Sequence, residues 1–197
     1  MSDTIIYRIG GAVYINLTNK CTNNCTFCLR ETNDGVDGYR LWLKKDPEAS
    51  EVIAALERES DVGETVFCGF GESTMRLEAL KEVAQYLKTR GSHVRLDTNG
   101  QGSAYAGRDI APELKGLVDI VSISLNASDA VKYDAICKSI YGEEGFDHMI
   151  AFARSCIKEG IETVLSVVDV IGPEEIERCQ KIADDLGAYL RVRHYIE

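Results

Sequence analysis

Apolar and polar residues alternate along several short stretches of this chain, and a segment with helical spacing follows most of them. The alternation predicts six strands, at residues 13–18, 65–68, 94–98, 119–125, 163–168 and 189–194. Between residues 74 and 91, apolar residues recur at intervals of three and four, as on one face of a helix. Strands that alternate with helices in this way indicate an α/β fold with a parallel sheet.

Capping residues predict where several helices begin and end. Asp46 followed by Pro47 is typical of a helix start, so we expect a helix from residue 47. Ser73 or Thr74 is expected to cap the next helix, and Gly91 to end it. Further helices are expected at residues 110–114, 129–136, 146–158 and 173–186.

The predicted strands are not apolar on both faces, as strands in a doubly covered parallel sheet usually are. Most of them carry a polar set on one face; these sets are Tyr14, Asn16 and Thr18; Arg95, Asp97 and Asn99; Ser122, Ser124 and Asn126; and Arg191 and Arg193. Buried polar groups need partners, which water and ligand in the lumen of a curved, open barrel would supply. A single exposed sheet face, or a polar core with internal hydrogen bonds, would give the same pattern. We expect a single domain over residues 1–197, built as a partial (β/α)6 barrel, open and TIM-like, with a polar lumen.

The composition limits the classes of function. A net charge of −10 in 197 residues argues against extended binding to nucleic acid. The first residues lack a basic segment followed by a long apolar run, and no stretch approaches the length of a membrane span. Seven cysteines, an odd number, favour a reducing cytoplasm over a secreted disulfide framework. We therefore expect a cytoplasmic protein that does not enter a membrane.

Three cysteines follow the first predicted strand with C-x3-C-x2-C spacing: Cys21, Cys25 and Cys28. Three thiolates can bind three irons of a cubane cluster and leave the fourth iron open to a substrate or cosubstrate. A structural zinc site usually needs four protein ligands, and a ferredoxin-type carrier needs a fourth cysteine nearby. The other cysteines are isolated in the sequence, so the open cluster is favoured over both alternatives; they are Cys68, Cys137, Cys156 and Cys179. We expect packing roles for Cys68, Cys156 and Cys179 and assign none to Cys137.

Short polar motifs follow the next three strands. Residues 69–72 read Gly-Phe-Gly-Glu, residues 97–100 read Asp-Thr-Asn-Gly, and Ser124 and Asn126 end the fourth strand. Each motif by itself is also a common turn sequence. Because the carboxyl ends of parallel strands meet at one edge of a sheet, all three motifs are expected near the cysteines.

The C-x3-C-x-aromatic-C run, in which Phe27 is the aromatic residue, resembles the radical S-adenosylmethionine (SAM) superfamily, as do the Gly71-Glu72 turn and the polar strand ends. Residues 14–18, 67–72, 122–127 and 191–197 resemble the TatD-linked radical SAM proteins, whose genes lie beside, or are fused to, TatD-type nucleases. The resemblance implies a [4Fe-4S] cluster on Cys21, Cys25 and Cys28, with SAM on the fourth iron. It implies SAM contacts at Phe27, Gly69, Gly71, Glu72, Asp97, Asn99, Ser124, Asn126 and Ile171. The sequence departs from the pattern of this family at two places. Ser73 stands where proline is usual, and the adenine-contact motif around Ile171 matches only in part.

The resemblance implies that an external one-electron donor of the flavodoxin or ferredoxin type drives reductive cleavage of SAM. The resulting 5′-deoxyadenosyl radical would abstract hydrogen from a substrate. Arg95, Arg191 and Arg193 predict an anionic small molecule, although ion pairs with Asp97 or Asp169 would also explain them. The candidate catalytic residues are Arg30, Arg193 and His194.

Two other functional classes stay open. One is a radical activase that acts on a protein partner, and the other is a non-catalytic iron–sulfur or zinc module. The resemblance also suggests a functional link to a TatD-type nuclease. The long segment 29–45, which contains Trp42, is expected to be either a lid over the site or a surface loop anchored by that tryptophan.

Overall fold

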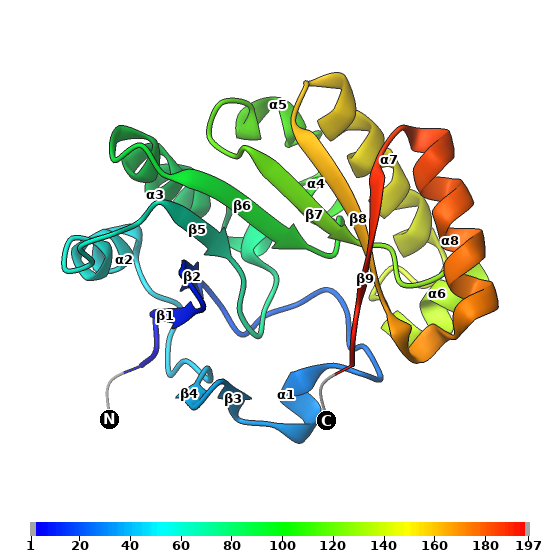
Figure 1. The fold of residues 1–197 in the computed structure, drawn as a ribbon, viewed down its shortest axis with the longest axis horizontal. Helices are drawn as coiled ribbons and strands as arrows, with labels where there is room; N and C mark the ends of the chain where they lie inside the picture. The colour runs from blue at the N-terminus through cyan, green and yellow to red at the C-terminus, as the bar shows by residue number, and fades with distance from the viewer. Residues whose placement is uncertain (1–2, 196–197) are drawn as a thin grey trace.

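The computed structural model describes residues 3–195 and contains one large sheet with the strand order β1-β2-β5-β6-β7-β8-β9 (Figure 1). The strands are β1 (Ile6–Ile9), β2 (Ala12–Ile15), β5 (Glu64–Phe67), β6 (His93–Thr98), β7 (Ile120–Ser124), β8 (Glu162–Val168) and β9 (Tyr189–Arg193). All neighbours from β2 to β9 pair in parallel, and β1 pairs antiparallel to β2. The predicted α/β fold with a parallel sheet is confirmed. The sheet is open, with β1 and β9 at its edges.

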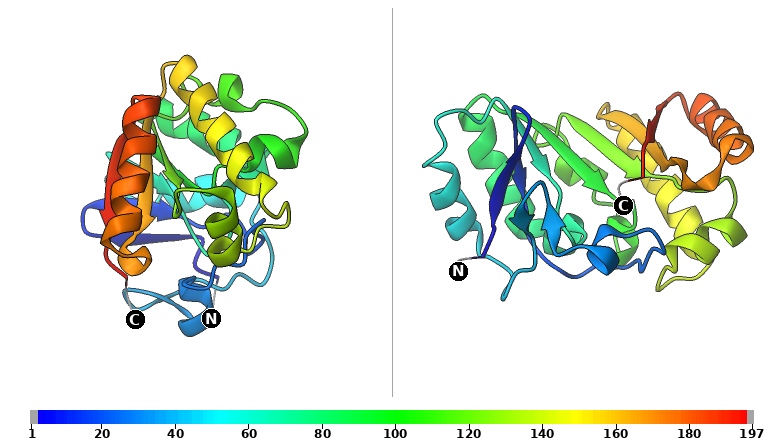
Figure 2. Two further views of the ribbon diagram at one scale, coloured as in Figure 1. Left: turned by 90° about the vertical axis from the view of Figure 1, so that its right-hand side faces the viewer. Right: turned by 60° about the horizontal axis from the view of Figure 1, so that its bottom comes forward.

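The helices that connect the parallel strands lie along one side of the sheet (Figures 1 and 2). They are α2 (Ala49–Leu56), α3 (Leu77–Thr89), α4 (Gly102–Ala106), α5 (Ala111–Leu114), α6 (Ala130–Cys137), α7 (Glu144–Lys158) and α8 (Pro173–Leu186), with the 3-10 turns η1 (Ser73–Arg76) and η2 (Asp169–Ile171). On the other side lies a segment with the short helix α1 (Leu29–Thr32) and a two-stranded hairpin, β3 (Gly35–Val36) and β4 (Tyr39–Arg40). No helix within residues 3–195 is long and apolar enough to cross a membrane. Residues 196 and 197, which end one of the segments resembling the TatD-linked proteins, lie outside the described part.

The edge strand β1 is absent from the strands predicted by alternation. It pairs with β2 through a tight turn at Gly10 and Gly11, with Ile9 opposite Ala12. Gly10 adopts a φ of 60°, which glycine reaches without the steric cost that other residues meet. A Gly-Gly pair between apolar stretches is a known signal for a hairpin, so the sequence contains the information needed to predict this strand.

Two predicted helix starts are wrong because glutamates supply the caps. Helix α2 begins at Ala49 rather than at Pro47, since Glu48 and Glu51 form a reciprocal capping box with each other's backbone. Turn η1 is capped by Glu72, whose side chain accepts from the backbone N–H of Thr74, so neither Ser73 nor Thr74 is the cap. A glutamate can replace the usual short capping residue when its carboxylate reaches the free N–H groups of the first turn.

Other helix ends agree with the sequence. Asp129 accepts from the backbone N–H of Lys132 and caps α6. Helix α8 starts at Pro173 and ends before Gly187, which has the left-handed φ of 71° expected after a helix. Helix α4 was not predicted, because its five residues carry no apolar periodicity.

The main core lies between the sheet and the connecting helices. Side chains of the central strands, such as Leu96 and Ile123, are fully buried against Leu80, Val83 and Leu87 of α3 and their counterparts on other helices. Burying one such side chain contributes about 1.5–3 kcal/mol. This layer fixes the sheet, and the carboxyl ends of its strands are then held on a rigid base.

A buried carboxylate joins α8 to the chain that follows β7. Glu175 accepts from the backbone N–H of Ser128 at 2.7 Å and forms ion pairs with Lys132 at 3.0 Å and with Arg178 at 2.7 Å. Burial raises the pKa of Glu175, but the hydrogen bonds from Ser128, Arg178 and Lys132 outweigh it and hold this pKa at about 2.

Glu175→Gln is expected to lower the free energy of unfolding at pH 7 by about 1–2 kcal/mol, because hydrogen bonds to a charged group are lost. The stabilisation by Glu175 is complete above pH 4.5, its ordinary pKa, and disappears as the pH falls toward about 2. Urea unfolding should therefore show a smaller difference in the free energy of unfolding between the wild type and Glu175→Gln at pH 3.5 than at pH 7. Glu174→Gln, on the exposed neighbour, is the control, and an equal effect of the two variants would contradict the assignment.

Candidate functional site

A cavity of about 580 Å³ opens at the carboxyl ends of the parallel strands. It brings together most of the residues predicted from the sequence: Cys21, Cys25, Phe27, Cys28, Gly69, Gly71, Glu72, Asp97, Asn99, Ser124, Asn126, Arg193 and His194. The polar strand faces contribute Tyr14, Arg95 and Arg191 as well. The alternation of polar and apolar residues therefore marks the wall of this cavity.

The cysteine loop is fastened by its backbone to the end of α6. The N–H of Asn24 donates to the carbonyl of Cys137 and that of Thr26 to the carbonyl of Ile136, both at 2.9 Å. The N–H of Ile140 returns a bond to the carbonyl of Thr22, also at 2.9 Å. These bonds satisfy backbone groups that would otherwise be unpaired in a segment without regular structure.

Buried side chains fasten the same loop from below. The hydroxyl of Tyr133 accepts from Nδ2 of Asn23 and from Nε2 of Gln101, each at 3.0 Å. Nδ2 of Asn99 donates to Oγ1 of Thr22 at 2.7 Å. Sequence reasoning missed Tyr133 and Gln101, because nothing in a single sequence marks polar residues that meet from distant segments.

The three cysteines present sulfur toward the cavity. Sγ of Cys21 lies 3.4 Å from the N–H of Asn23 and 3.7 Å from Nδ2 of Asn99, but burial and the charge of Glu72 outweigh the hydrogen bond from Asn23 and raise the pKa of this thiol to about 12. Within residues 3–195, no three histidine, cysteine or acidic side chains lie close enough to bind one ion. The cysteines of a cubane each bind a different iron, so they need not converge on a single ion.

A fourth cysteine lies beside this motif. The thiol of Cys137, fully buried at the end of α6, hydrogen-bonds with that of Cys25. Its Sγ also accepts from Nδ2 of Asn126 at 3.7 Å. The sequence assigned Cys137 no role, and the structure places it behind the cysteine loop rather than on the cavity wall.

Glu72 ties two strand ends together. Its Oε1 accepts from Oγ1 of Thr74 at 2.7 Å and from Oγ1 of Thr98 at 2.8 Å, and its Oε2 accepts from the N–H of Asn99 at 2.7 Å. The side chain is 4% exposed. Because Oε1 is already saturated, only Oε2 retains room for a further donor such as an ammonium group.

The two glycines before Glu72 are required by neighbouring chain segments. A Cβ at Gly69 would overlap with the side chain of Asn16, and one at Gly71 would overlap with the carbonyl of Thr18 and lie 2.5 Å from that of Lys20. The N–H of Glu72 donates to the carbonyl of Lys20 at 2.7 Å. The turn is therefore pressed against the segment that leads into Cys21.

Two predicted site residues do not line the cavity. Ile171 lies in η2 and packs against the main core, and Val168 lines the cavity instead. Arg30 donates to the carbonyl of Asn23 at 3.2 Å and to Oδ1 of Asn24 at 3.0 Å, so it supports the cysteine loop from outside.

The third candidate catalytic residue, His194, lines the cavity but points largely into solvent. Its Nδ1 lies 2.8 Å from Oδ2 of Asp169, and its side chain is 93% exposed. This hydrogen bond holds the residue after β9 against η2. This contact gives Asp169 and His194 a structural role, so their presence does not require a catalytic one.

Arg95 is occupied by partners on its own side of the cavity. It lies 3.1 Å from Asp97, 3.2 Å from Glu64 and 3.3 Å from the hydroxyl of Tyr14. The expected internal ion pair with Asp97 is therefore present. Arg95 alone does not supply a free cation to the cavity.

The last strand faces the ends of β5 and β6 across the cavity. Burial and the charge of nearby Asp97 raise the pKa of Cys68, which follows β5, to about 12, against the lowering influence of Arg193 and Arg95. Burial also raises the pKa of Asp97, against the opposing charges of Arg95, Arg193 and Arg191. Arg193 of β9 thus lines the same cavity as Asp97 and Cys68, which belong to strands three and four places away in the sheet order.

Aromatic residues from the edge hairpin close one wall. The rings of Tyr7 and Tyr14 stack with centroids 5.2 Å apart, and the hydroxyl of Tyr7 donates to the carbonyl of Cys68 at 3.1 Å. Sequence reasoning missed Tyr7, because β1 was not predicted. Recognising the Gly-Gly hairpin would have placed it beside Tyr14.

The segment 29–45 lies over the cavity, which Leu29, Val36 and Leu41 help to line. Nδ2 of Asn16 donates to the carbonyl of Leu41 at 2.7 Å. Trp42 is 38% exposed and packs edge-on against Phe70 at 5.1 Å rather than inserting into the main core. This arrangement favours the covering role over a surface loop anchored in the core.

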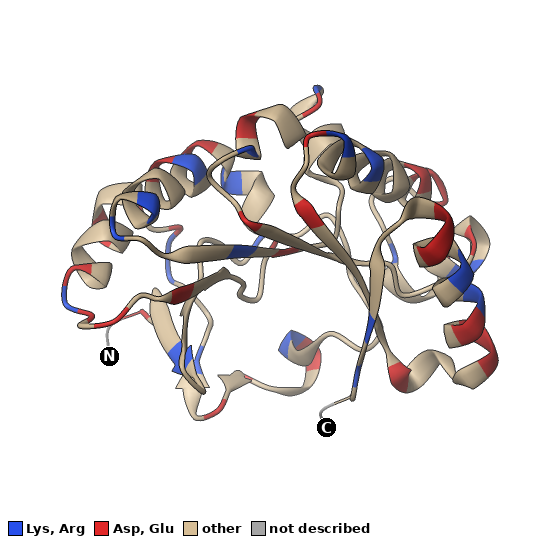
Figure 3. Cartoon of the chain, turned by 45° about the horizontal axis from the view of Figure 1, so that its top comes forward, with Lys and Arg blue, Asp and Glu red and all other residues tan. Residues whose placement is uncertain are grey.

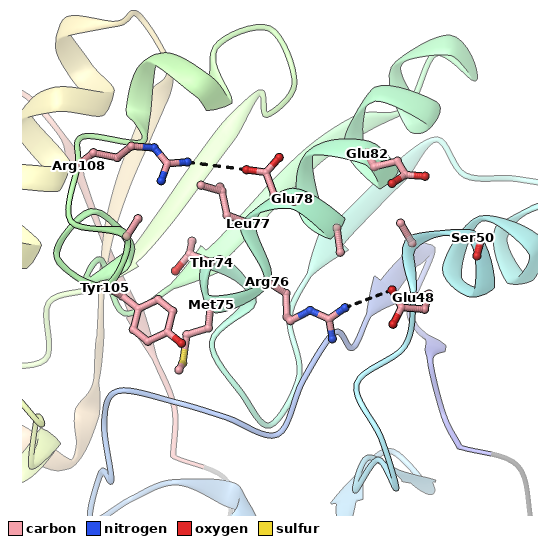
Figure 4. Close-up of a pocket in the computed structure, with 13 residues that line it drawn as sticks. Glu48, Ser50, Thr74, Met75, Arg76, Leu77, Glu78, Glu82, Tyr105 and Arg108 are labelled. Carbon is pink, nitrogen blue, oxygen red and sulfur yellow. Dashed lines mark ion pairs between the residues drawn. The ribbon is translucent and has the colours of Figure 1, made fainter.

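A second cavity, of about 610 Å³, lies outside this region against α2, η1, α3 and α4 (Figure 4). Arg76 pairs there with Glu48 at 3.9 Å, and Arg108 pairs with Glu78 at 3.7 Å. None of the predicted site residues lines it. Both of its arginines are held in ion pairs, so the first cavity is the functional candidate.

Comparison with known proteins gives the family. The model of the radical SAM superfamily matches residues 15–186. The chain belongs to this superfamily. Its members are enzymes that use a [4Fe-4S] cluster and SAM, and they generally need an electron donor in addition to a substrate.

Individual relatives of this radical SAM chain are distant. A probable GTP 3′,8-cyclase of Pyrococcus abyssi is 29% identical over 181 residues, which cover 90% of this chain and 54% of that protein. The chain covers only 40% and 54% of the two curated relatives that it matches.

Solved structures share the fold of this radical SAM chain. Streptococcus suis SuiB bound to the precursor peptide SuiA aligns with a TM-score of 0.70 at 16% identity, over 93% of this chain and 39% of that one. The anSMEcpe enzyme with bound AdoMet aligns with a TM-score of 0.68 at 17% identity, over 93% and 51%. At these identities the likeness shows the fold alone.

Gly71→Ala is expected to lower the free energy of unfolding by about 1–3 kcal/mol, because the added methyl group collides with two backbone carbonyls that cannot move independently. Gly11→Ala is the matched control, since a Cβ there meets nothing within 4 Å and its φ is not in the left-handed region. Urea denaturation compares the two. Equal stability of the variants would refute the close packing of this turn.

Proposed function

We propose that this chain carries out a radical SAM reaction on an anionic small molecule. Cys21, Cys25 and Cys28 would bind the [4Fe-4S] cluster. The observation that carries the proposal is that three cysteine sulfurs, unpaired polar atoms and the arginines of β9 face one cavity.

The donor set of the cavity fits these cofactors. Asn126 has a backbone φ of 57°, is 2% exposed and lines the cavity, and its Oδ1 has no hydrogen-bond partner in residues 3–195. A buried acceptor without a donor costs about 1–3 kcal/mol, so a ligand hydroxyl is its natural partner. We therefore propose that Asn126, with Ser124 beside it, binds ribose hydroxyls of SAM rather than its carboxylate.

The remaining SAM contacts follow from the same geometry. The free capacity of Oε2 on Glu72 suits the amino group, and Phe27 and Val168 offer apolar surface to the adenine. Gly69, Gly71 and Asn99 shape this part of the wall. Ile171 is not proposed as a contact, because it does not reach the cavity.

When bound, the cluster and SAM together supply a radical that removes a hydrogen atom from the substrate. The residues of the chain would orient the reactants and keep water out. Tyr7, Tyr14, Leu29, Leu41 and Phe70 form the apolar cover of the cavity and suit this second task.

The finer details of fold and partners are also proposals. Six parallel strands with outer helices and a curved sheet support a partial (β/α)6 barrel over a single domain of residues 1–197. A flavodoxin or ferredoxin would supply the electron. Membership of the TatD-linked subgroup, with a TatD-type nuclease as functional partner, rests on the sequence resemblance.

Anaerobic reconstitution should load about four irons per chain, and reduction in the presence of SAM should release 5′-deoxyadenosine. Cys25→Ala is expected to lose the cluster and to reduce 5′-deoxyadenosine to background, because one iron loses its only protein ligand. Iron analysis and mass spectrometry measure the two quantities.

Two cysteine variants serve as controls for this experiment. Cys156→Ala changes a buried cysteine on α7, and Cys137→Ala removes the cysteine behind the motif without removing a proposed ligand. Both should keep full iron loading. Iron retention by Cys25→Ala, or a matching loss in Cys137→Ala, would overturn the ligand set. Loaded, reduced protein that releases no nucleoside would favour the non-catalytic iron–sulfur module, and release only with a polypeptide substrate would favour the activase.

A further inference from the structure

We propose that Arg191 and Arg193 of β9 form a subsite for a carboxylate or phosphate group of the substrate. This inference rests on the proposed function, since it assigns a substrate class to the same cavity. The two residues lie on one strand, visible as basic positions on β9 in Figure 3. Both line the cavity.

Neither arginine has an ionic partner within residues 3–195, whereas Arg95 has three polar neighbours. Nε of Arg193 is buried and makes no hydrogen bond within residues 3–195, and unlike Nε of Arg95, which lies 3.1 Å from Asp97, it has no carboxylate at ion-pair distance there. Leaving a buried donor of a charged group unsatisfied is costly, so an acceptor from a ligand would be strongly favoured there. The acceptor must come from the cavity, which Arg193 faces.

The local charge favours an anion. Arg95, Arg191 and Arg193 all lie near Asp97, and burial raises the pKa of this aspartate against their opposing influence. Asp97 is the carboxylate that pairs with Arg95, and the partners of Glu72 are hydroxyls and backbone N–H groups. Asp97 is thus shared among three arginines, and within residues 3–195 neither Arg191 nor Arg193 forms an ion pair of its own.

The spacing of the two arginines suits one anionic group. Residues two apart on a strand lie on the same face, about 6.5–7 Å apart along the strand. Two guanidinium groups at this separation can converge on one carboxylate or phosphate, each offering paired N–H donors.

The position of the subsite points to substrate rather than to SAM. The arginine that contacts the cysteine loop is Arg30, through the carbonyl of Asn23 and Oδ1 of Asn24. Arg191 and Arg193 make no hydrogen bond to that loop within residues 3–195, and they line the cavity together with Cys68 and Asp97 at the ends of β5 and β6. The β9 arginines are thus left for a substrate anion that binds beside the cofactor.

Calorimetric titration with malonate and with inorganic pyrophosphate at low ionic strength tests the subsite. The wild type should bind at least one of these probes, and the one that binds more tightly indicates whether the substrate group is a carboxylate or a phosphate. Arg193→Gln and Arg191→Gln should each weaken that binding by about tenfold or more, because paired hydrogen bonds to an anion are lost. Arg154→Gln, which removes one exposed charge on α7, should bind the probe as the wild type does.

Measurements with SAM separate this inference from the proposed function. Arg193→Gln should keep the SAM affinity of the wild type and its release of 5′-deoxyadenosine in the absence of substrate. Loss of SAM affinity would assign Arg193 to the cofactor and overturn the subsite. The subsite would also be overturned if the wild type binds neither probe. The same holds if Arg191→Gln and Arg193→Gln bind the probe as tightly as the wild type does. Probe binding that depends on Arg193 in a chain that never cleaves SAM would leave the subsite standing and refute the proposed reaction alone.

Discussion

The buried carboxylate of Glu72 holds the site together. Its side chain joins the turn after β5 to the end of β6, and its own N–H bonds to the carbonyl of Lys20, directly before the first cysteine. Asn99, which Glu72 positions, then donates to Thr22 inside the cysteine loop. This carboxylate has no cationic partner within residues 3–195, and it is stable in this position because four hydrogen-bond donors replace the water that it loses. The cysteine loop, which has no regular structure, thereby acquires a fixed place above the sheet.

The two parts of the cavity are built differently. The part near the cysteines consists of the ends of central strands, which the buried core keeps rigid. The part near Arg191 and Arg193 consists of the edge strand β9 and faces the hairpin β1–β2. Edge elements have fewer neighbours and tolerate more change than central strands, whereas cofactor contacts need a rigid frame. The shared fold with SuiB and anSMEcpe at 16–17% identity concerns the sheet and its helices as a whole.

Hydrophobic periodicity and capping residues predicted most parallel strands and the longer connecting helices, because these signals act within a few residues of the chain. The failures have local causes as well. Glu48 and Glu72 replaced the expected caps, and the Gly10-Gly11 turn was overlooked, so β1 and Tyr7 were missed. The hydrogen bonds of Tyr133 with Asn23 and Gln101 could not be predicted from the sequence, since none of the three residues belongs to a recognisable motif in its own segment.

The sequence by itself determined the family, because the spacing of three cysteines and the motifs at strand ends are set by local chemistry. It also determined that polar strand faces would meet, since alternation places them on one side of the sheet. Only the tertiary structure decided which groups already have ionic partners: within residues 3–195, Arg95 pairs with Asp97 and Glu64 whereas Arg193 forms no ion pair, and Ile171 turns away from the cavity. The reason is that the curvature of the sheet and the packing of the edge elements bring together residues from opposite ends of the chain. Local sequence patterns do not predict such long-range contacts.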